Sequence, residues 1–255
     1  MSLAFQAMTR LLSRTQPEMQ SVDGARLQRI GPNCWSADRE LAYGQRASLP
    51  VRMVVTRGGE GRLTLYSPVA IDDGTIEALA GLGEVVRVVV PNRFHTLFAG
   101  RVLERYRDAE LLVPEVNAGL AERFPDRTTI VTQAAAVDHG LELYPVRLRD
   151  GLVELCAYHD DSESLILADL LFNFQQAPSR LARVLYRLNG IWQRPGHSRL
   201  QRLLLLKNTD ELRRFYRWAL AKPFSQIVMA HGQMISNDAR EQFYQAFSRY
   251  GAVGR

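Results

Sequence analysis

The chain has 255 residues, of which 46% are hydrophobic and 23% are charged, the composition of an ordinary soluble globular protein. This composition excludes a disordered or fibrous protein, and no stretch reaches the ~20 consecutive apolar residues that a membrane-spanning helix needs. The formal net charge of +5 is local. Residues 178–222 carry eleven basic and two acidic side chains, a net +9, which leaves −4 for the rest of the chain.

The first twenty residues lack the basic-then-apolar order of a signal peptide and end shortly after Pro17. We expect residues 1–20 to form an N-terminal arm and residues 21–255 to form a single domain. The two cysteines, Cys34 and Cys156, form neither a disulfide framework nor a CxxC metal motif. They indicate a cytoplasmic protein in which both thiols are buried apolar residues.

In the first half of the chain, apolar periodicity and turn residues predict a β-rich start followed by a βαβ unit. Strands at 52–57 and 62–67 flank a glycine cluster at 58–61, which predicts a hairpin. The spacing of Ile76, Leu79 and Leu82 predicts a helix at 72–82 that ends at Gly83. The following predicted elements are a buried strand at 85–90, a helix at 98–106, a strand at 110–113 and a helix at 116–123.

In the second half, strands predicted at 141–148, 152–158 and 164–171 form hairpins, and Pro145 places the first of them near a sheet edge. Residues 178–222 are predicted to be mostly helical, a basic helical insertion before a strand at 224–230 and a C-terminal helix at 238–250. This order fits an α+β protein with two mixed sheets and helices outside them, a four-layer αββα sandwich.

Four apolar runs each stop at or near a residue that can bind a metal ion. Val85–Val90 leads to His95, Val153–Tyr158 to His159, Ser164–Ala168 to Asp169 and Gln226–Ala230 to His231. Strands that carry such groups at the same end of a sheet would bring them together. Imidazole and carboxylate ligands of this kind suit Zn²⁺ or Fe²⁺.

From about residue 27 to 250, the order of elements and ligands resembles the metallo-β-lactamase fold superfamily. The segment around His159 is similar to the Gly-His-Thr/Ser motif of that family. Ala168-Asp169 is similar to its Gly-Asp strand end, and His231-Gly232 to its final Gly-His. The resemblance therefore implies His159, Asp169 and His231 as metal ligands.

The family's first motif, His-x-His-x-Asp-His, is degenerate in this chain. When the loop at 91–100 is aligned on Gly100, the ligand positions hold Asn92, Phe94, Thr96 and Leu97. His95 is out of phase by one residue. The Pro-Asn-x-x-His pattern of this loop resembles an uncharacterised branch of the superfamily, a domain of unknown function. We therefore expect a reduced site that holds at most one metal ion.

In the functional interpretation, His159, Asp169 and His231 hold one Zn²⁺ or Fe²⁺, with His95 or water as the fourth ligand, and activate water for hydrolysis. Asp160 or Asp161 would orient a histidine or act as a base, and Asn92 and Arg93 would contact an acidic group of a small-molecule substrate. In the alternative interpretation, no ion binds, and the histidines simply hydrogen-bond to Asp169.

The protein is accordingly expected to be a metal-dependent hydrolase or a non-catalytic descendant that binds a ligand or partner. The basic segment at 178–222 combines arginines with leucines and aromatic residues. Such a segment can bind an anionic surface, either a membrane or a nucleic acid. The alternative is a solvated basic face on helices whose apolar face packs inward.

Overall fold

The computed structural model describes residues 18–20, 27–43, 47–115, 118–138, 140–177, 179–204 and 209–251. Residues 1–17 of the expected N-terminal arm lie outside these ranges. The last three residues of that arm, Glu18–Gln20, form strand β1, which pairs with β3 (Cys34–Tyr43). The expected arm therefore ends in a short strand of the first sheet.

Two mixed sheets form the centre of the molecule. The first has the order β1-β3-β4-β5-β6-β7-β8, with β2 also paired to β3. Its β3, β4 and β5 run antiparallel, whereas β5 to β8 run parallel. Its other strands are β2 (Gln28–Gly31), β4 (Ala47–Arg57), β5 (Arg62–Tyr66), β6 (Glu84–Val89), β7 (Glu110–Val113) and β8 (Thr128–Ile130).

The second sheet has the order β13-β12-β11-β10-β9. Its strands are β9 (Ala135–Asp138), β10 (Leu141–Arg147), β11 (Val153–His159), β12 (Ser164–Leu167) and β13 (Gln226–Met229). β9 to β12 pair antiparallel in succession, but β12 and β13 run parallel. The directions of these last three strands decide which residues meet at each end of the sheet.

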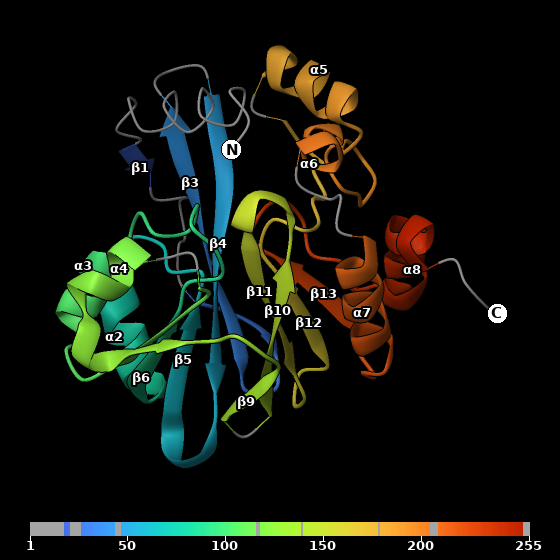
Figure 1. Ribbon diagram of the computed structural model, residues 1–255. Helices are drawn as coiled ribbons and strands as arrows, with labels where there is room; N and C mark the ends of the chain where they lie inside the picture. The colour runs from blue at the N-terminus through green and yellow to red at the C-terminus, as the bar shows by residue number, and fades with distance from the viewer. Residues whose placement is uncertain are drawn as a thin grey trace.

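Helices cover the outer faces of both sheets (Figure 1). The first sheet carries α2 (Asp73–Leu82), α3 (Ala99–Arg105) and α4 (Ala118–Arg123), and the second carries α7 (Thr209–Leu220) and α8 (Ala239–Gly251). α5 (Arg180–Asn189) and α6 (Arg199–Leu204) lie together beyond one end of the second sheet. The predicted four-layer αββα arrangement is confirmed.

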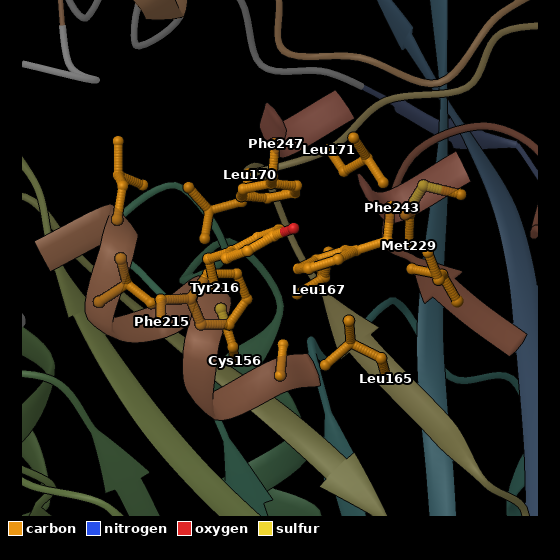
Figure 2. Packing of buried hydrophobic residues seen from close by; sticks show 14 of the residues in the cluster. Cys156, Leu165, Leu167, Leu170, Leu171, Phe215, Tyr216, Met229, Phe243 and Phe247 are labelled. Atoms are coloured by element: carbon orange, nitrogen blue, oxygen red, sulfur yellow. The ribbon is translucent and has the colours of Figure 1, made fainter. Parts of the chain in front are cut away.

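Three apolar clusters hold these layers together. One lies between the two sheets and includes Val54, Leu155 and Val228. A second packs the first sheet against its helices. The third joins the second sheet to α7 and α8, where Phe215 and Phe243 and their neighbours are fully buried (Figure 2). Each such side chain contributes roughly 1.5–3 kcal/mol through removal of apolar surface from water.

Local signals explain why several elements begin and end where they do. The Asp72 carboxylate caps α2 by accepting the Thr75 backbone N–H at 2.8 Å, as expected at a helix N-terminus. α2 stops at Gly83, whose φ of +155° brings its backbone against Gly61. An added Cβ there would lie 1.8 Å from the Gly61 carbonyl oxygen, so this helix end requires glycine.

The predicted position of Pro145 near a sheet edge needs a correction. β10 lies between β9 and β11, so it is an inner strand. Pairing with β9 nevertheless stops at Leu143, and Pro145 lies beyond it, where a missing N–H costs no ladder hydrogen bond. No helix among the described residues is both long and apolar enough to cross a membrane.

Candidate metal centre

Asp169 and His231 meet because the strands before them are parallel neighbours. Leu167 at the end of β12 pairs with Met229 at the end of β13. The carboxyl ends of parallel strands meet at one edge of a sheet. Both side chains therefore project from the same edge, which we call the Asp169 rim. Their contact is direct, with His231 Nε2 3.3 Å from Asp169 Oδ1.

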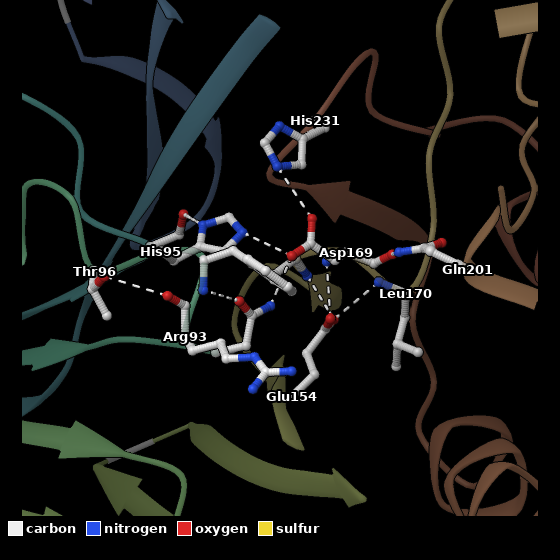
Figure 3. A network of polar contacts seen from close by, with 12 residues as sticks. Arg93, His95, Thr96, Glu154, Asp169, Leu170, Gln201 and His231 are labelled. Carbon is white, nitrogen blue, oxygen red and sulfur yellow. Dashed lines mark hydrogen bonds and ion pairs between the residues drawn. The ribbon is translucent and has the colours of Figure 1, made fainter. Parts of the chain in front are cut away.

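The loop after β6 brings a third and a fourth side chain from the other sheet. His95 Nε2 lies 3.2 Å from Asp169 Oδ2, and Asn92 Nδ2 donates to the same oxygen at 2.8 Å (Figure 3). One ligand atom from each of His95, Asp169 and His231 lies within 4.8 Å of the others. The structure thus brings together three of the four predicted metal ligands, with His95 and not His159 as the second imidazole.

The far nitrogen of each imidazole has its own partner. His231 Nδ1 lies 2.8 Å from the Pro50 carbonyl oxygen. Because a carbonyl only accepts, Nδ1 carries the hydrogen, and in a neutral ring Nε2 is then the lone-pair nitrogen that faces Asp169. His95 Nδ1 lies 2.8 Å from Ser67 Oγ. Ligating histidines are commonly oriented by such contacts, so this arrangement fits a metal site.

The distances also fit a shared ion. Two ligands bonded at 2.0–2.1 Å to one tetrahedral Zn²⁺ lie about 3.3 Å apart. The two imidazole–carboxylate separations have this size, although His95 lies 3.2 Å from Oδ2 of Asp169 and His231 lies 3.3 Å from Oδ1. Without an ion, burial disfavours a charged Asp169, but its electrostatic interaction with His95 and its hydrogen bonds with His231 and His95 hold its pKa well below the usual range. Asp169 is therefore ionised, the form that ligates metal.

A buried glutamate holds the backbone around Asp169 in place. Glu154 lies on β11, and its carboxylate accepts the backbone N–H groups of Ala168 and Asp169 at 2.9 Å and of Leu170 at 3.2 Å. Burial, followed by the charge of Asp169, raises the Glu154 pKa to about 7 against the lowering effect of these three hydrogen bonds. This residue was not predicted from the sequence. The available signal was a single acidic side chain inside a fully buried strand.

A buried arginine holds the loop that carries His231. Arg52 of β4 forms a bidentate pair with Asp38 at 2.7 and 2.8 Å. Its Nη1 donates to the carbonyl oxygens of Met229 and Gly232 at 2.8 and 2.9 Å. Gly232 has φ of +85°, and a Cβ there would lie 2.4 Å from the Asn173 carbonyl oxygen. The glycine after His231 is thus required by this tight turn.

His159 lies at the opposite rim, contrary to its predicted place beside Asp169. β11 and β12 are antiparallel, and His159 pairs with Ser164 at the start of β12. Asp169 follows five residues later, about 16 Å away along an extended chain. His159 is fully buried, and its Nδ1 lies 2.8 Å from Ser162 Oγ. Burial lowers its pKa despite the opposing charges of Asp161 and Asp160, which favours the neutral ring.

The predicted catalytic carboxylates, Asp160 and Asp161, lie at the same rim as His159. Asp160 and Asp161 form the turn after β11, and Asp161 Oδ2 accepts the Asn33 side-chain amide at 2.7 Å. The reason is again strand direction, because an antiparallel hairpin puts the end of one strand beside the start of the next. The structure therefore separates both from the Asp169 rim.

The predicted substrate contacts are turned inward. Asn92 is completely buried and bonds to Asp169 and to the Phe94 backbone N–H at 2.8 Å. The Nε and Nη2 atoms of Arg93 are buried, and its guanidinium points away from both imidazoles (Figure 3). Asn92 thus orients Asp169, and these nitrogens of Arg93 do not face a substrate. His197 is also buried, with Nδ1 2.5 Å from the Leu170 carbonyl oxygen.

Solved structures of two kinds share this fold. The chain superposes with a TM-score of 0.62 on residues 1–254 of a protein from Nostoc sp. PCC 7120 assigned as a diflavin flavoprotein, at 11% identity over 92% of this chain and 96% of that one. The flavodiiron core of Flv1 from Synechocystis sp. PCC6803 gives 0.59, at 11% identity over 92% of this chain and 61% of that one.

A metallo-β-lactamase from Pontibacter korlensis gives a TM-score of 0.56, at 14% identity over 91% of this chain and 99% of that one. No protein-family model and no curated protein matches the sequence. At such identities, the comparisons establish a shared fold and not a shared activity.

Proposed function

We propose that this chain, which has the metallo-β-lactamase fold, is a metal-dependent hydrolase with one divalent ion held by His95, Asp169 and His231. The convergence of these three side chains at one rim carries the proposal. Three protein ligands leave coordination positions for water and substrate, as in catalytic zinc sites. Zn²⁺ and Fe²⁺ both accept a set of imidazole and carboxylate ligands.

A single ion is supported by the number of ligands. Among the described residues, only this group of histidine, cysteine, aspartate and glutamate side chains is close enough to share an ion. When bound, the ion supplies Lewis-acid polarisation of a substrate oxygen and lowers the pKa of a coordinated water. Pro50 and Ser67 fix the two rings, and Asn92 holds one oxygen of Asp169.

In this proposal, a small-molecule substrate approaches from the open side of Asp169, whose side chain is 17% exposed. Asp160 and Asp161 have no catalytic role in it because they lie at the other rim. Phe172 stacks on the His231 ring with centroids 5.8 Å apart and an interplanar angle of 18°. This aromatic side chain would form an apolar wall of the substrate site.

The alternative is a non-catalytic ligand-binding protein in which no ion is bound. One observation favours it. Burial disfavours protonation of His231, but its hydrogen bond and charge interaction with Asp169 raise the pKa above the ordinary value. A protonated His231 would donate to Pro50 and to Asp169, which satisfies the cluster without metal.

Metal analysis separates the two functions. The full chain, purified without chelator or a metal-affinity tag, is expected to contain about one equivalent of zinc or iron, and chelator should lower its melting temperature. Turnover is then measured on a panel of ester, thioester and phosphoester substrates with the loaded and the chelated protein. Less than about a tenth of an equivalent, with melting unchanged by chelator, would exclude the hydrolase and leave the binding function.

A further inference from the structure

Helix α5 exposes its apolar face to solvent. Its inner side is anchored by Tyr186, whose ring stacks on Phe174 with centroids 4.1 Å apart and an interplanar angle of 8°. On its outer side, Val184, Leu185 and Leu188 are 50%, 48% and 61% exposed. They are spaced at i, i+1 and i+4, which places them on one face of the helix. Exposed apolar patches of this kind mark interaction sites.

Helix α7 shows that an arginine-rich helix of this segment can bury its apolar face. It also alternates arginines with apolar residues, but its apolar side chains, among them Leu212 and Phe215, are buried in the core. Two of its three exposed arginines also have acidic partners, since Arg213 pairs with Asp210 at 3.1 Å and Arg214 pairs with Glu211. Within the segment from 178 to 222, α7 therefore buries its apolar face, whereas α5 exposes Val184, Leu185 and Leu188.

The exposed face of α5 is flanked by uncompensated positive charge. Arg180, Arg183 and Arg187 are all exposed, and α5 contains no acidic residue. Arg183 and Arg187 lie over the Trp192 ring at 5.7 and 5.9 Å. Within the described part of the chain, none of the three forms an ion pair with a carboxylate. The exposed apolar side chains are thus flanked by arginines that have no carboxylate partner among the described residues and can meet an anionic one.

The neighbouring α6 and its preceding loop extend this composition. Arg199 is exposed, and Leu203 is 65% exposed. A cavity of about 330 Å³ opens between this loop and α8, and its lining includes Arg194 and Arg202 but no acidic residue. A cavity of that size with two guanidinium groups can accept a phosphate-bearing headgroup.

The same region touches the candidate metal centre. The Gln201 side chain of α6 donates to the Asp169 carbonyl oxygen. Phe174, which supports α5, stacks on Phe172 with centroids 5.9 Å apart, and Phe172 in turn stacks on His231. A partner bound to α5 and α6 would consequently lie at the mouth of the Asp169 rim.

We propose that α5 and α6 dock on the surface of a membrane that contains anionic lipids. Val184, Leu185, Leu188 and Leu203 enter the headgroup region, while the surrounding arginines contact lipid phosphates. An amphipathic helix with an arginine-rich polar face and an opposite apolar face binds membrane surfaces in this way. The helix lies in the interface and does not cross the bilayer.

Charge and apolarity together select this partner over two others. A nucleic acid would pair with the arginines but would leave the exposed leucines facing a charged backbone. A second copy of the chain related by two-fold symmetry would set the same arginine rows against each other. Of these three partners, only an anionic bilayer offers both an apolar layer and negative charge. The docking does not depend on the proposed hydrolase, and it would bring the rim to amphiphilic substrates if that function holds.

Vesicle co-sedimentation of the full chain tests the proposal. We expect binding to phosphatidylcholine vesicles that contain about 30 mol% phosphatidylglycerol, weak binding to pure phosphatidylcholine, and a loss of affinity as salt rises. The double variant L185S/L188S should weaken binding at least tenfold. Ile130→Ser is the matched control, because Ile130 is 51% exposed on β8, an edge strand of the first sheet, and this variant should bind as the wild type does.

Charge is tested separately with R180Q/R199Q, which should weaken binding about fivefold for each arginine removed. Arg213→Gln, on the already paired helix α7, should change binding less than twofold. Wild-type melting temperatures of all variants verify folding.

Absence of vesicle binding, equal binding of L185S/L188S, or tighter binding to single-stranded nucleic acid than to anionic vesicles would each overturn the proposal. Concentration-dependent dimers that L185S/L188S abolishes, without vesicle binding, would assign the face to a second copy.

Discussion

The two rims of the second sheet carry similar side chains in opposite arrangements. At the Asp169 rim, a carboxylate whose side chain is 17% exposed faces two imidazoles. At the other rim, His159 is fully buried, and its Nε2 has no hydrogen-bond partner among the described residues. Histidine after an apolar strand is common to both, so the direction of the neighbouring strands decides which rim can hold an ion.

The supporting groups differ as much as the histidines do. At the Asp169 rim, Glu154 and Pro50 each contact a candidate ligand or its backbone, and Arg52 binds backbone carbonyls on either side of His231. At the His159 rim, Ser162, Ser164 and Gln226 bond to one another in a closed cluster, with Ser162 Oγ 2.7 Å from Ser164 Oγ. One rim is built around a point that an ion can occupy, and the other is filled by its own polar groups.

The largest difference between the rims should appear in metal content. Asp169→Asn removes the only carboxylate among the three candidate ligands, so we expect bound metal to fall from about one equivalent to less than about a tenth. Asp161→Asn, at the other rim, should leave metal content unchanged. Elemental analysis of both purified variants makes the comparison. Equal metal content in the two would show that the ion, if bound, lies elsewhere.

The next largest effect concerns the arginine that holds the His231 loop. Arg52→Met leaves two carbonyl oxygens and the partly exposed Asp38 without their partner, so we expect a loss of about 1–3 kcal/mol in the free energy of unfolding. Urea denaturation measures it. Arg213→Met serves as control, because Arg213 is 45% exposed and pairs with the 74% exposed Asp210, so its loss should cost less than about 1 kcal/mol. Similar losses in both variants would remove Arg52 from its assigned role.

A smaller effect is expected at the carboxylate beneath Asp169. Glu154→Gln keeps the size of the side chain but replaces one acceptor oxygen with an amide that faces backbone N–H groups. Changes to the groups that hold a metal ligand in place cost about 10- to 100-fold in metal affinity. Competition with a chromogenic chelator measures the affinity. Gln175→Glu is the control. It replaces an amide with a carboxylate of the same size and should leave the metal affinity unaltered.

The smallest effect tests a pair on the His159 side of the sheet. Glu142, which lies opposite Tyr158 in the β10–β11 pair, contacts Lys222 and accepts the Trp218 side-chain N–H at 2.6 Å. Burial opposes its ionisation, yet the hydrogen bonds of Lys222 and Trp218 lower its pKa below the ordinary value. The stabilisation is therefore full above the unfolded-state pKa and disappears as the pH falls through the folded one.

Glu142→Gln should accordingly destabilise the protein by less than about 1 kcal/mol at pH 7 and by nothing below the folded pKa. Urea denaturation of both proteins at neutral pH and at several acid pH values gives the difference in unfolding free energy. Metal content should stay at the wild-type value throughout the neutral range. A difference that grows toward acid pH would have the wrong sign for a carboxylate whose pKa is lowered.

Much of the fold follows from local sequence signals. The hairpin at 52–67, helix α2 and the β11–β12 hairpin were predictable because glycine turns, an aspartate cap and apolar runs act within a few residues. The strands β1, β8 and β9 were not predicted, because runs of three or four residues carry too little periodicity. Their existence depends on partners supplied by distant parts of the chain.

The candidate site was predictable in its chemistry but not in its full geometry. His95, Asp169 and His231 were recognisable as ligand types at strand ends, and the structure brings them together. The predicted place of His159 required its strand to run in the same direction as β12, and a short hairpin makes that impossible. Arg52 and Glu154 act through backbone groups far away in sequence, so no local pattern identifies them.

The origin of the three candidate ligands has a consequence for how the molecule opens. His95 comes from the loop after a strand of the first sheet, whereas Asp169 and His231 come from the second. A cation bound to all three would link the first sheet to the second. Amide protons of β6 and β13 should then exchange with solvent more slowly, and by the same factor, when the cation is present. Separation of the sheets would release it in the same cooperative event.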